Sequence, residues 1–508
     1  MNPFRRPNSS SSSSIMSKST PKTTPRSSAS SAELTGEAKL DDLTKLMGKL
    51  KSDLQEISLL PHQRDAILEQ VKVYGRDPTH ADPIFTKEGI ETLTRHAFNS
   101  PSQNTSRAAL RCLANAMLLR AETRQIFVDL GYMSKACAKL KLDSRDDEFL
   151  VSRILFLTTY DTNIDIVNLI DEDKLAENIC VNISRHGKLC QAKATKTKDP
   201  MQDMALIESL KLLFNLTHFC PDRCASFTPA LHPILTVVSK VPIASQNPLE
   251  APVAPLVNAL LNLDLDNKSN VPTLFPKSSP NVYLDCFIEI LDKSTKIYKD
   301  PELEQLVSPL LTLLRKMYEV GPGDAKEQMR RVILPSAVDR QQPLGRAESL
   351  ASRLLRLSTN PGTPQVRETI SGLQFDMSDK DARRFVQNVG YGFASGFLFQ
   401  HNVPIPENAL EAWSTSSSGR RNTRASQDNR NIDRAINPVT GQFLDQEEHV
   451  EVKMTQEEKE REAERLFVLF ERRLVWLMLK ILSPRPFRKE AFALENSPGA
   501  YKDSILRL

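Results

Sequence analysis

Three asparagines stand in apolar, Leu-rich segments of this chain, and their amides are the first groups whose chemistry needs an explanation. They are Asn115 in ALRCLANAML, Asn215 in SLKLLFNLTHF and Asn262 in LVNALLNLDL. A basic or amide residue stands four positions before each of them: Arg111, Lys211 and Asn258. An amide can exchange hydrogen bonds with a peptide backbone, and a neighbouring cation suits a carboxylate. The pattern therefore predicts a strip of side chains that binds a peptide or a helix.

These segments recur at a spacing typical of helical repeats. Asn215 and Asn262 are 47 residues apart, and Asn115 is 42 residues from Leu157, which replaces the Asn in the related segment RILFLTTYD. Asn115 and Asn215 are 100 residues apart, about two repeats with an insertion. Periods of about 40–47 residues with two or three helices each indicate an armadillo or HEAT array. We therefore expect an all-α, right-handed helical solenoid.

Helical geometry places the Asn strip relative to the core of each repeat. At 100° per residue, Leu210, Leu213, Phe214 and Thr217 fall on one face of their helix, which we expect to be buried. Asn215 lies well round from that face, so stacked repeats would align the Asn pairs along one groove. The alternative is that each Asn ties down the inter-helix turn of its own repeat.

Composition narrows the class of protein. The chain has 508 residues, 40% hydrophobic and 6% aromatic, with a net charge of +4. A basic stripe interleaved with aromatics is absent from the sequence, so a nucleic-acid partner is not expected. No apolar run reaches the length of a membrane span. The 7 scattered Cys residues favour a reducing compartment, and Cys220 and Cys224 with His218 and His232 match no standard zinc spacing, so no metal site is expected.

Changes in composition divide the chain into segments. We expect a disordered Ser/Thr-rich tail at 1–36, the solenoid at 37–405, a flexible polar linker at 406–454, and an amphipathic helix with a tail at 455–508. The last helix opens with a capping box made by Thr455 and Glu458.

Several segments together resemble the synembryn family. They are GRDPTHADPIFT, ESLKLLFNLTHF, NVGYGFASGFL, and above all AINPVTGQ followed by MTQEEKEREAERLFVLFERR. The resemblance covers residues from about 40 to 472, and the Ser-rich start suggests a fungal member. This family comprises exchange factors and folding chaperones of heterotrimeric G-protein α (Gα) subunits. The resemblance implies a solenoid whose concave face captures the C-terminal helix of Gα and whose own C-terminal helix contacts the GTPase domain.

The resemblance also assigns candidate residues. Those of the Gα-binding groove are Arg76, Arg111, Asn115, Lys211, Asn215, Asn258 and Asn262. Those of the C-terminal contact with Gα are Leu466, Phe467 and Phe470, which could instead dock back on the solenoid. The acidic, phosphorylatable stretch of animal members is missing here, and Thr423 after RRN suits a kinase that prefers basic residues.

The expected function is nucleotide exchange by binding, without covalent chemistry and without a cofactor. The chain lacks GxxxxGK[ST], HExxH and GxSxG. The segment GYGFASG lacks a third Gly at the spacing of a nucleotide-binding loop, and no strand is expected before it. The expected partner is GDP-bound or nucleotide-free Gα, bound by a monomer in the cytoplasm that the G protein can recruit to the plasma membrane. The alternative is a general armadillo adaptor that binds another peptide.

Overall fold

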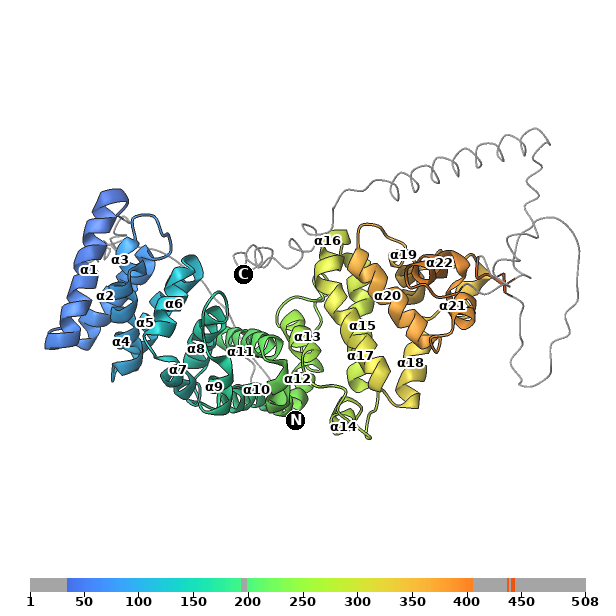
Figure 1. The fold of residues 1–508 in the computed structure, drawn as a ribbon, viewed down its shortest axis with the longest axis horizontal. Helices are drawn as coiled ribbons and strands as arrows, with labels where there is room; N and C mark the ends of the chain where they lie inside the picture. Colours follow the sequence, from blue (N-terminus) through green and yellow to red (C-terminus); the bar gives the residue numbers. More distant parts are fainter. Residues whose placement is uncertain (1–33, 193–198, 405–435, 438–439, 444–508) are drawn as a thin grey trace, which may run out of the picture. The chain divides into compact units, whose positions relative to one another are not determined.

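The computed structural model of the chain describes residues 34–192, 199–404, 436–437 and 440–443. They form a succession of helices joined by short turns (Figure 1). Within these residues, strand-like pairing is limited to one isolated antiparallel β-bridge between Ile436 and Phe443. The predicted all-α solenoid is therefore confirmed.

The helices of the first half are α1 (Gly36–Glu56), α2 (Pro61–Tyr74), α3 (Asp82–Phe85), α4 (Lys87–Asn99), α5 (Gln103–Leu119), α6 (Glu122–Asp129), α7 (Met133–Lys139), α8 (Arg145–Thr158), α9 (Ile166–Asp171), α10 (Leu175–Gln191), α11 (Pro200–Phe219), η1 (Pro221–Ala230) and α12 (Leu231–Val238). Those of the second half are α13 (Val253–Leu261), α14 (Val271–Leu274), α15 (Val282–Ile297), α16 (Asp300–Glu302), η2 (Leu303–Val307), α17 (Ser308–Val320), α18 (Gly323–Ile333), η3 (Asp339–Gln341), α19 (Leu350–Leu357), α20 (Pro364–Met377), α21 (Ala382–Val389) and α22 (Tyr391–Gln400).

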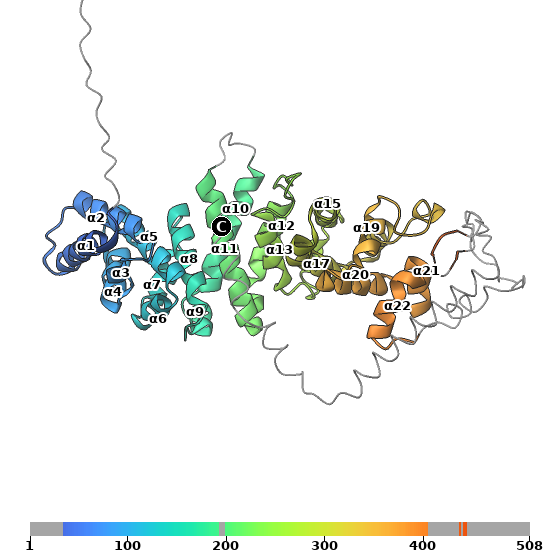
Figure 2. The ribbon, with the colours of Figure 1, turned by 90° about the horizontal axis from the view of Figure 1, so that it is seen from above.

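One helix of each repeat packs directly on its counterpart in the next repeat. These helices are α2, α5, α8, α11, α13, α17 and α20, each in contact with the next, and we call them the central row (Figure 2). Asn115, Leu157 and Asn215 lie on α5, α8 and α11, and Asn262 directly follows α13. The repeats predicted from the Asn spacing therefore correspond to consecutive helices of this row.

The sequence marks the beginnings of the row helices clearly. Ser102, Ser144 and Asp199 are the N-caps of α5, α8 and α11, and each side chain accepts a hydrogen bond from a backbone N–H of the first turn. Such caps satisfy donors that the helix itself leaves unpaired. The Leu-rich helices then bury one continuous apolar cluster that extends from Leu43 in α1 to Met377 in α20.

A short segment near the C-terminus is bound to the end of the array. We call residues 436–437 and 440–443 the C-terminal anchor. The backbone N–H of Leu344 donates to the Thr440 carbonyl (3.2 Å), and that of Phe443 donates to the Arg340 carbonyl (2.9 Å). The buried Arg340 side chain donates from Nη1 to the Gly441 carbonyl (2.9 Å). These residues belong to the segment 406–454, which we expected to be a linker, and they contact the end of the helical array.

None of the helices in the described parts of the chain is both long and apolar enough to cross a membrane.

Candidate functional site

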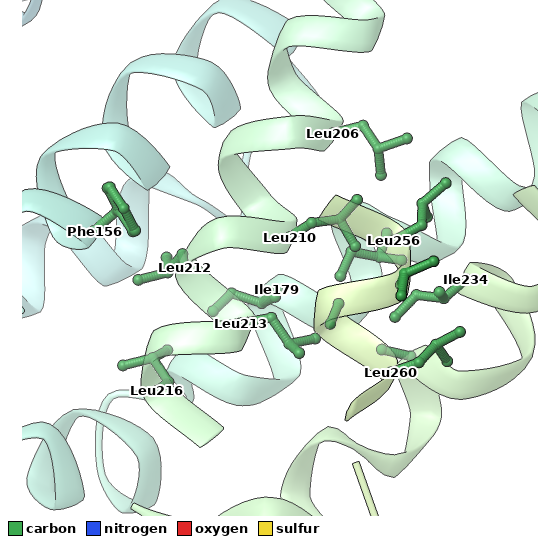
Figure 3. Packing of buried hydrophobic residues seen from close by; sticks show 14 of the residues in the cluster. Phe156, Ile179, Leu206, Leu210, Leu212, Leu213, Leu216, Ile234, Leu256 and Leu260 are labelled. Atoms are coloured by element: carbon green, nitrogen blue, oxygen red, sulfur yellow. The ribbon is translucent and has the colours of Figure 1, made fainter. Parts of the chain in front are cut away.

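Asn215 does not lie on an open strip. Its side chain is only 5% exposed, its Nδ2 donates to the Thr159 hydroxyl (2.8 Å), and its Oδ1 accepts from the Tyr160 hydroxyl (3.4 Å). The expectation that Asn215 points away from buried surface is therefore wrong. Because α11 is an inner member of a stack, it has neighbours on two sides. Figure 3 shows Leu212 and Leu216 directed towards Phe156 of α8, with Leu210 and Leu213 on the opposite side towards Leu256 and Leu260 of α13.

The other Asn side chains of the strip differ in their surroundings. Asn262 is half-buried, and its Nδ2 donates to the Phe214 carbonyl of α11 (3.2 Å). Asn115 and Asn258 are also half-buried. Amides bind carbonyls of a neighbouring helix elsewhere too: Asn178 of α10 donates to the Cys137 carbonyl of α7 (3.0 Å). Asn215 and Asn262 thus tie consecutive repeats together, whereas the alternative above placed these bonds within one repeat.

The cations of the strip are held by acids on the helices of the row. Arg111 pairs with Asp146 of α8 (3.1 Å), and Lys211 pairs with Glu208 one turn earlier on α11 (2.9 Å). Arg76 is exposed in the turn after α2. The structure adds Arg107 and Arg153, neither of which the Asn pattern singled out. Arg107 pairs with Asp147 (3.0 Å), and Arg153 of α8 reaches across to Glu208 (3.1 Å).

In three of these pairs, those of Arg107, Arg153 and Lys211, the cation is the more exposed partner, whereas Arg111 and Asp146 are about equally exposed. The Arg107 side chain is 20% exposed and that of Asp147 only 3%, and the Lys211 and Glu208 side chains are 29% and 4% exposed. Burial by itself raises the pKa of the Asp147 carboxyl, but hydrogen bonds from Arg107 and Ser144 outweigh it and hold that pKa below its usual value. The hydrogen bond with Asp147 raises the pKa of the Arg107 guanidinium. Arg107 and Lys211 are therefore each held by a buried carboxylate and remain partly exposed to solvent.

Aromatic side chains lie beside these cations. The Lys211 ammonium is 5.2 Å from the ring centre of Phe156, and the Arg153 guanidinium is 5.1 Å from that of Phe149. One turn further along α11, Phe214 and His218 stack at 6.1 Å, and Phe219 is 47% exposed. We call Phe214, His218 and Phe219 the aromatic ledge.

The ledge was not predicted from the sequence, which suggested a core position for Phe214. The sequence feature that could have predicted the ledge is the aromatic ending of KLLFNLTHF. In this segment Lys211, Phe214 and His218 stand at i, i+3 and i+7 and so share one side of the helix.

The sulfur and imidazole groups near the ledge do not assemble a metal site. Within the described parts of the chain, no group of three or more His, Cys, Asp or Glu side chains is placed to hold a metal ion. The Cys224 thiol donates instead to the Thr217 carbonyl (3.5 Å).

Several predicted residues lie outside the described residues. They are Leu466, Phe467 and Phe470 of the C-terminal contact and the phosphorylation candidate Thr423.

The stacked helices place this protein in the helical-repeat class, whose members offer extended binding surfaces along consecutive repeats. Within that class, the chain belongs to the synembryn family. The family model described as "Guanine nucleotide exchange factor synembryn" matches residues 67–481.

Relatives from fungi and vertebrates match over long stretches. A synembryn-like chaperone of Schizosaccharomyces pombe is 25% identical over 342 residues, which are 65% of this chain and 62% of the yeast protein. The chaperone Ric-8A of Gallus gallus is 24% identical over 477 residues, 84% of each chain. Ric-8A of Pongo abelii is 23% identical over 468 residues, 86% of this chain and 85% of the relative. The alignment with the yeast relative thus leaves more than a third of that relative unmatched, whereas the vertebrate alignments span most of both chains.

Proposed function

We propose that this protein is a guanine nucleotide exchange factor and folding chaperone for the α subunit of heterotrimeric G proteins. The observation that carries this proposal is the family match over residues 67–481. The names of the relatives, which describe chaperones, support the second activity.

The central row offers a surface suited to the C-terminal helix of Gα. Cations of α5, α8 and α11 face outwards over buried acids, and the aromatic ledge lies on the same stripe of α11 as Lys211. An amphipathic helix could place its apolar side chains on the ledge and its carboxylates against the cations. Within this proposal Lys211, Arg111 and Arg76 keep their predicted binding role. Asn215 and Asn262 shape the surface by joining the helices beneath it.

The proposed mechanism needs binding energy alone. A protein that binds nucleotide-free Gα more tightly than GDP-bound Gα shifts the population towards the nucleotide-free conformer. By linkage, the same preference weakens GDP binding in the complex by an equal factor, and each tenfold preference corresponds to about 1.4 kcal/mol. Binding of GTP to Gα then releases Gα from the complex. Preference for a nucleotide-free, loosened Gα also suits a chaperone of the newly made subunit. The chain would act as a cytoplasmic monomer that the G protein brings to the membrane.

The alternative is an armadillo adaptor that holds an extended peptide through a ladder of free Asn amides. Two features disfavour it. The Asn215 amide is engaged with Thr159 and Tyr160, and the Asn262 amide donates to Phe214. Because Asn215 is also buried, its amide is not available for a ladder of hydrogen bonds with a ligand backbone.

GDP release from a purified Gα subunit tests the proposal. We expect the full-length chain to accelerate the release of a fluorescent GDP analogue, and Phe219→Ser to weaken both acceleration and complex formation. Leu189→Ser is the matched control, because Leu189 is 43% exposed on α10, outside the central row. An unchanged release rate, with no complex on size-exclusion chromatography and no gain in folded Gα on co-expression, would refute the proposal.

A further inference from the structure

The cations at the step from α5 to α8 pair with one buried and one exposed acid, whereas both cations at the step from α8 to α11 pair with one buried acid. At the α5–α8 step, Arg107 pairs with the buried Asp147, but Asp146 is 36% exposed, as much as its partner Arg111 at 35%. At the α8–α11 step, Arg153 and Lys211 are 32% and 29% exposed, and the Glu208 carboxylate that holds them is 4% exposed. This second step therefore presents two cations above a buried acid.

Both cations contact the same oxygen of that acid. Arg153 Nη2 is 3.1 Å and Lys211 Nζ is 2.9 Å from Glu208 Oε1. The other oxygen, Oε2, is buried and has no hydrogen-bond partner among the described residues. One carboxylate cannot balance two cations, so this cluster carries an excess positive charge. Glu148 of α8 is another buried acid, and its oxygens bind His186 (3.0 Å) and Ser209 (2.7 Å).

The two cations are also held in place from the side. Arg153 lies over the Phe149 ring and Lys211 over the Phe156 ring, at 5.1 and 5.2 Å. A ring and a carboxylate together restrict a long side chain, so a ligand need not order it. A guanidinium has five N–H donors and an ammonium three, so both retain donors beyond those aimed at Glu208.

We propose that Arg153 and Lys211 form a binding site for a carboxylate of a helical peptide. Glu208 is the buried counter-charge that positions both cations and limits the affinity of the site. The aromatic ledge begins one turn beyond Lys211, so a helix bound here would present an acidic group beside apolar ones. The identity of the peptide rests on the proposed function, and the carboxylate chemistry rests on the cluster itself.

Two synthetic peptides test the site. One has the last twenty or so residues of a Gα subunit, and the other has the same sequence with every carboxylate, including the chain end, replaced by an amide. We expect the full-length protein to bind the acidic peptide more tightly, as measured by fluorescence anisotropy. Arg153→Gln and Lys211→Gln should each weaken binding of the acidic peptide by about 10- to 100-fold, as for a lost charged hydrogen bond. Their effect on the neutral peptide should be small.

Glu208→Gln separates a binding site from a purely structural ion cluster. An amide can still accept the hydrogen bonds of both cations but no longer cancels their charge. We expect the Glu208→Gln protein to bind the acidic peptide a few-fold more tightly than the wild type, and its affinity to depend more steeply on salt concentration. A purely structural role predicts no tighter binding. If Glu208→Gln folds poorly, the Arg153 and Lys211 variants decide the question alone. Arg223→Gln is the control, because Arg223 pairs with Asp171 (2.9 Å) outside the central row.

The outcomes separate the proposed carboxylate site from the proposed action on Gα. Equal binding of the two peptides, or a preference that survives in Arg153→Gln and Lys211→Gln, overturns the carboxylate site. If GDP release is still accelerated in that case, the proposed function stands without it. If the protein binds neither peptide and does not act on Gα, both proposals fall.

Discussion

The side-chain amide of Asn215 on α11 and the hydroxyl of Thr159, the residue that follows α8, are joined by a hydrogen bond of 2.8 Å. This bond links two consecutive repeats at a buried position, beside Leu212 and Leu216. The same side chain accepts a second bond from Tyr160. An Asn that first suggests ligand binding is thus a tie between helices.

Replacing this tie should therefore affect stability. We expect Asn215→Ala to lower the free energy of unfolding by about 1–3 kcal/mol, because it removes two hydrogen bonds between consecutive repeats at a buried position. Asn115→Ala is the control, because Asn115 is half-buried at the equivalent position of α5 and should cost less. Urea unfolding followed by circular dichroism measures both. Equal stability of the two variants would contradict the role given to Asn215.

The Asp147–Arg107 pair predicts a defined pH dependence. The folded-state pKa of Asp147 is below its usual value, so its stabilising contribution is present above the unfolded pKa of about 3.9 and is lost as pH falls through the folded pKa. Asp147→Asn should cost about 1–3 kcal/mol at neutral pH. The gap between variant and wild type should shrink below about pH 4. Thermal midpoints measured between pH 7 and pH 3 check this, and a constant gap would count against it.

The C-terminal anchor depends on a glycine. Gly441 has a φ of 69°, and a methyl group added there would overlap the Leu344 side chain. We expect Gly441→Ala to release the anchor, which hydrogen–deuterium exchange would detect as faster exchange at Leu344 and Phe443. Gly396→Ala is the matched control, because a methyl group there meets no atom within 4 Å in α22. It should leave exchange at the anchor unchanged, since Ala suits a helix better than Gly.

The C-terminal helix expected at 455–473 is assigned to exchange rather than to capture. We therefore expect a chain truncated before Thr455 to keep its affinity for a Gα C-terminal peptide, because the central row is intact. It should no longer accelerate GDP release, because the expected contact with the GTPase domain is gone. Peptide anisotropy and the release assay on one preparation measure both effects. Full exchange by the truncated chain would remove this helix from the mechanism.

The repeats and the family could both be predicted from the order of residues along the chain. The Asn115, Leu157, Asn215 and Asn262 spacing gave the register of consecutive row helices, because each repeat must bury an equivalent Leu-rich stripe. Segments such as AINPVTGQ identified the family that the match over 67–481 confirms. These features are local in the chain, so no tertiary contact is needed to read them.

The buried sides of each helix and the pairing of its charges depend on how the helices pack, so they could not be predicted in the same way. Periodicity describes the apolar stripe of one helix but not the number of its neighbours, so the burial of Asn215 between α11 and α8 could not be foreseen. Arg153 and Glu208 lie far apart in the sequence, and nothing local connects them. Their ion pair arises because α8 packs on α11, which places Glu208 beneath both Arg153 and Lys211.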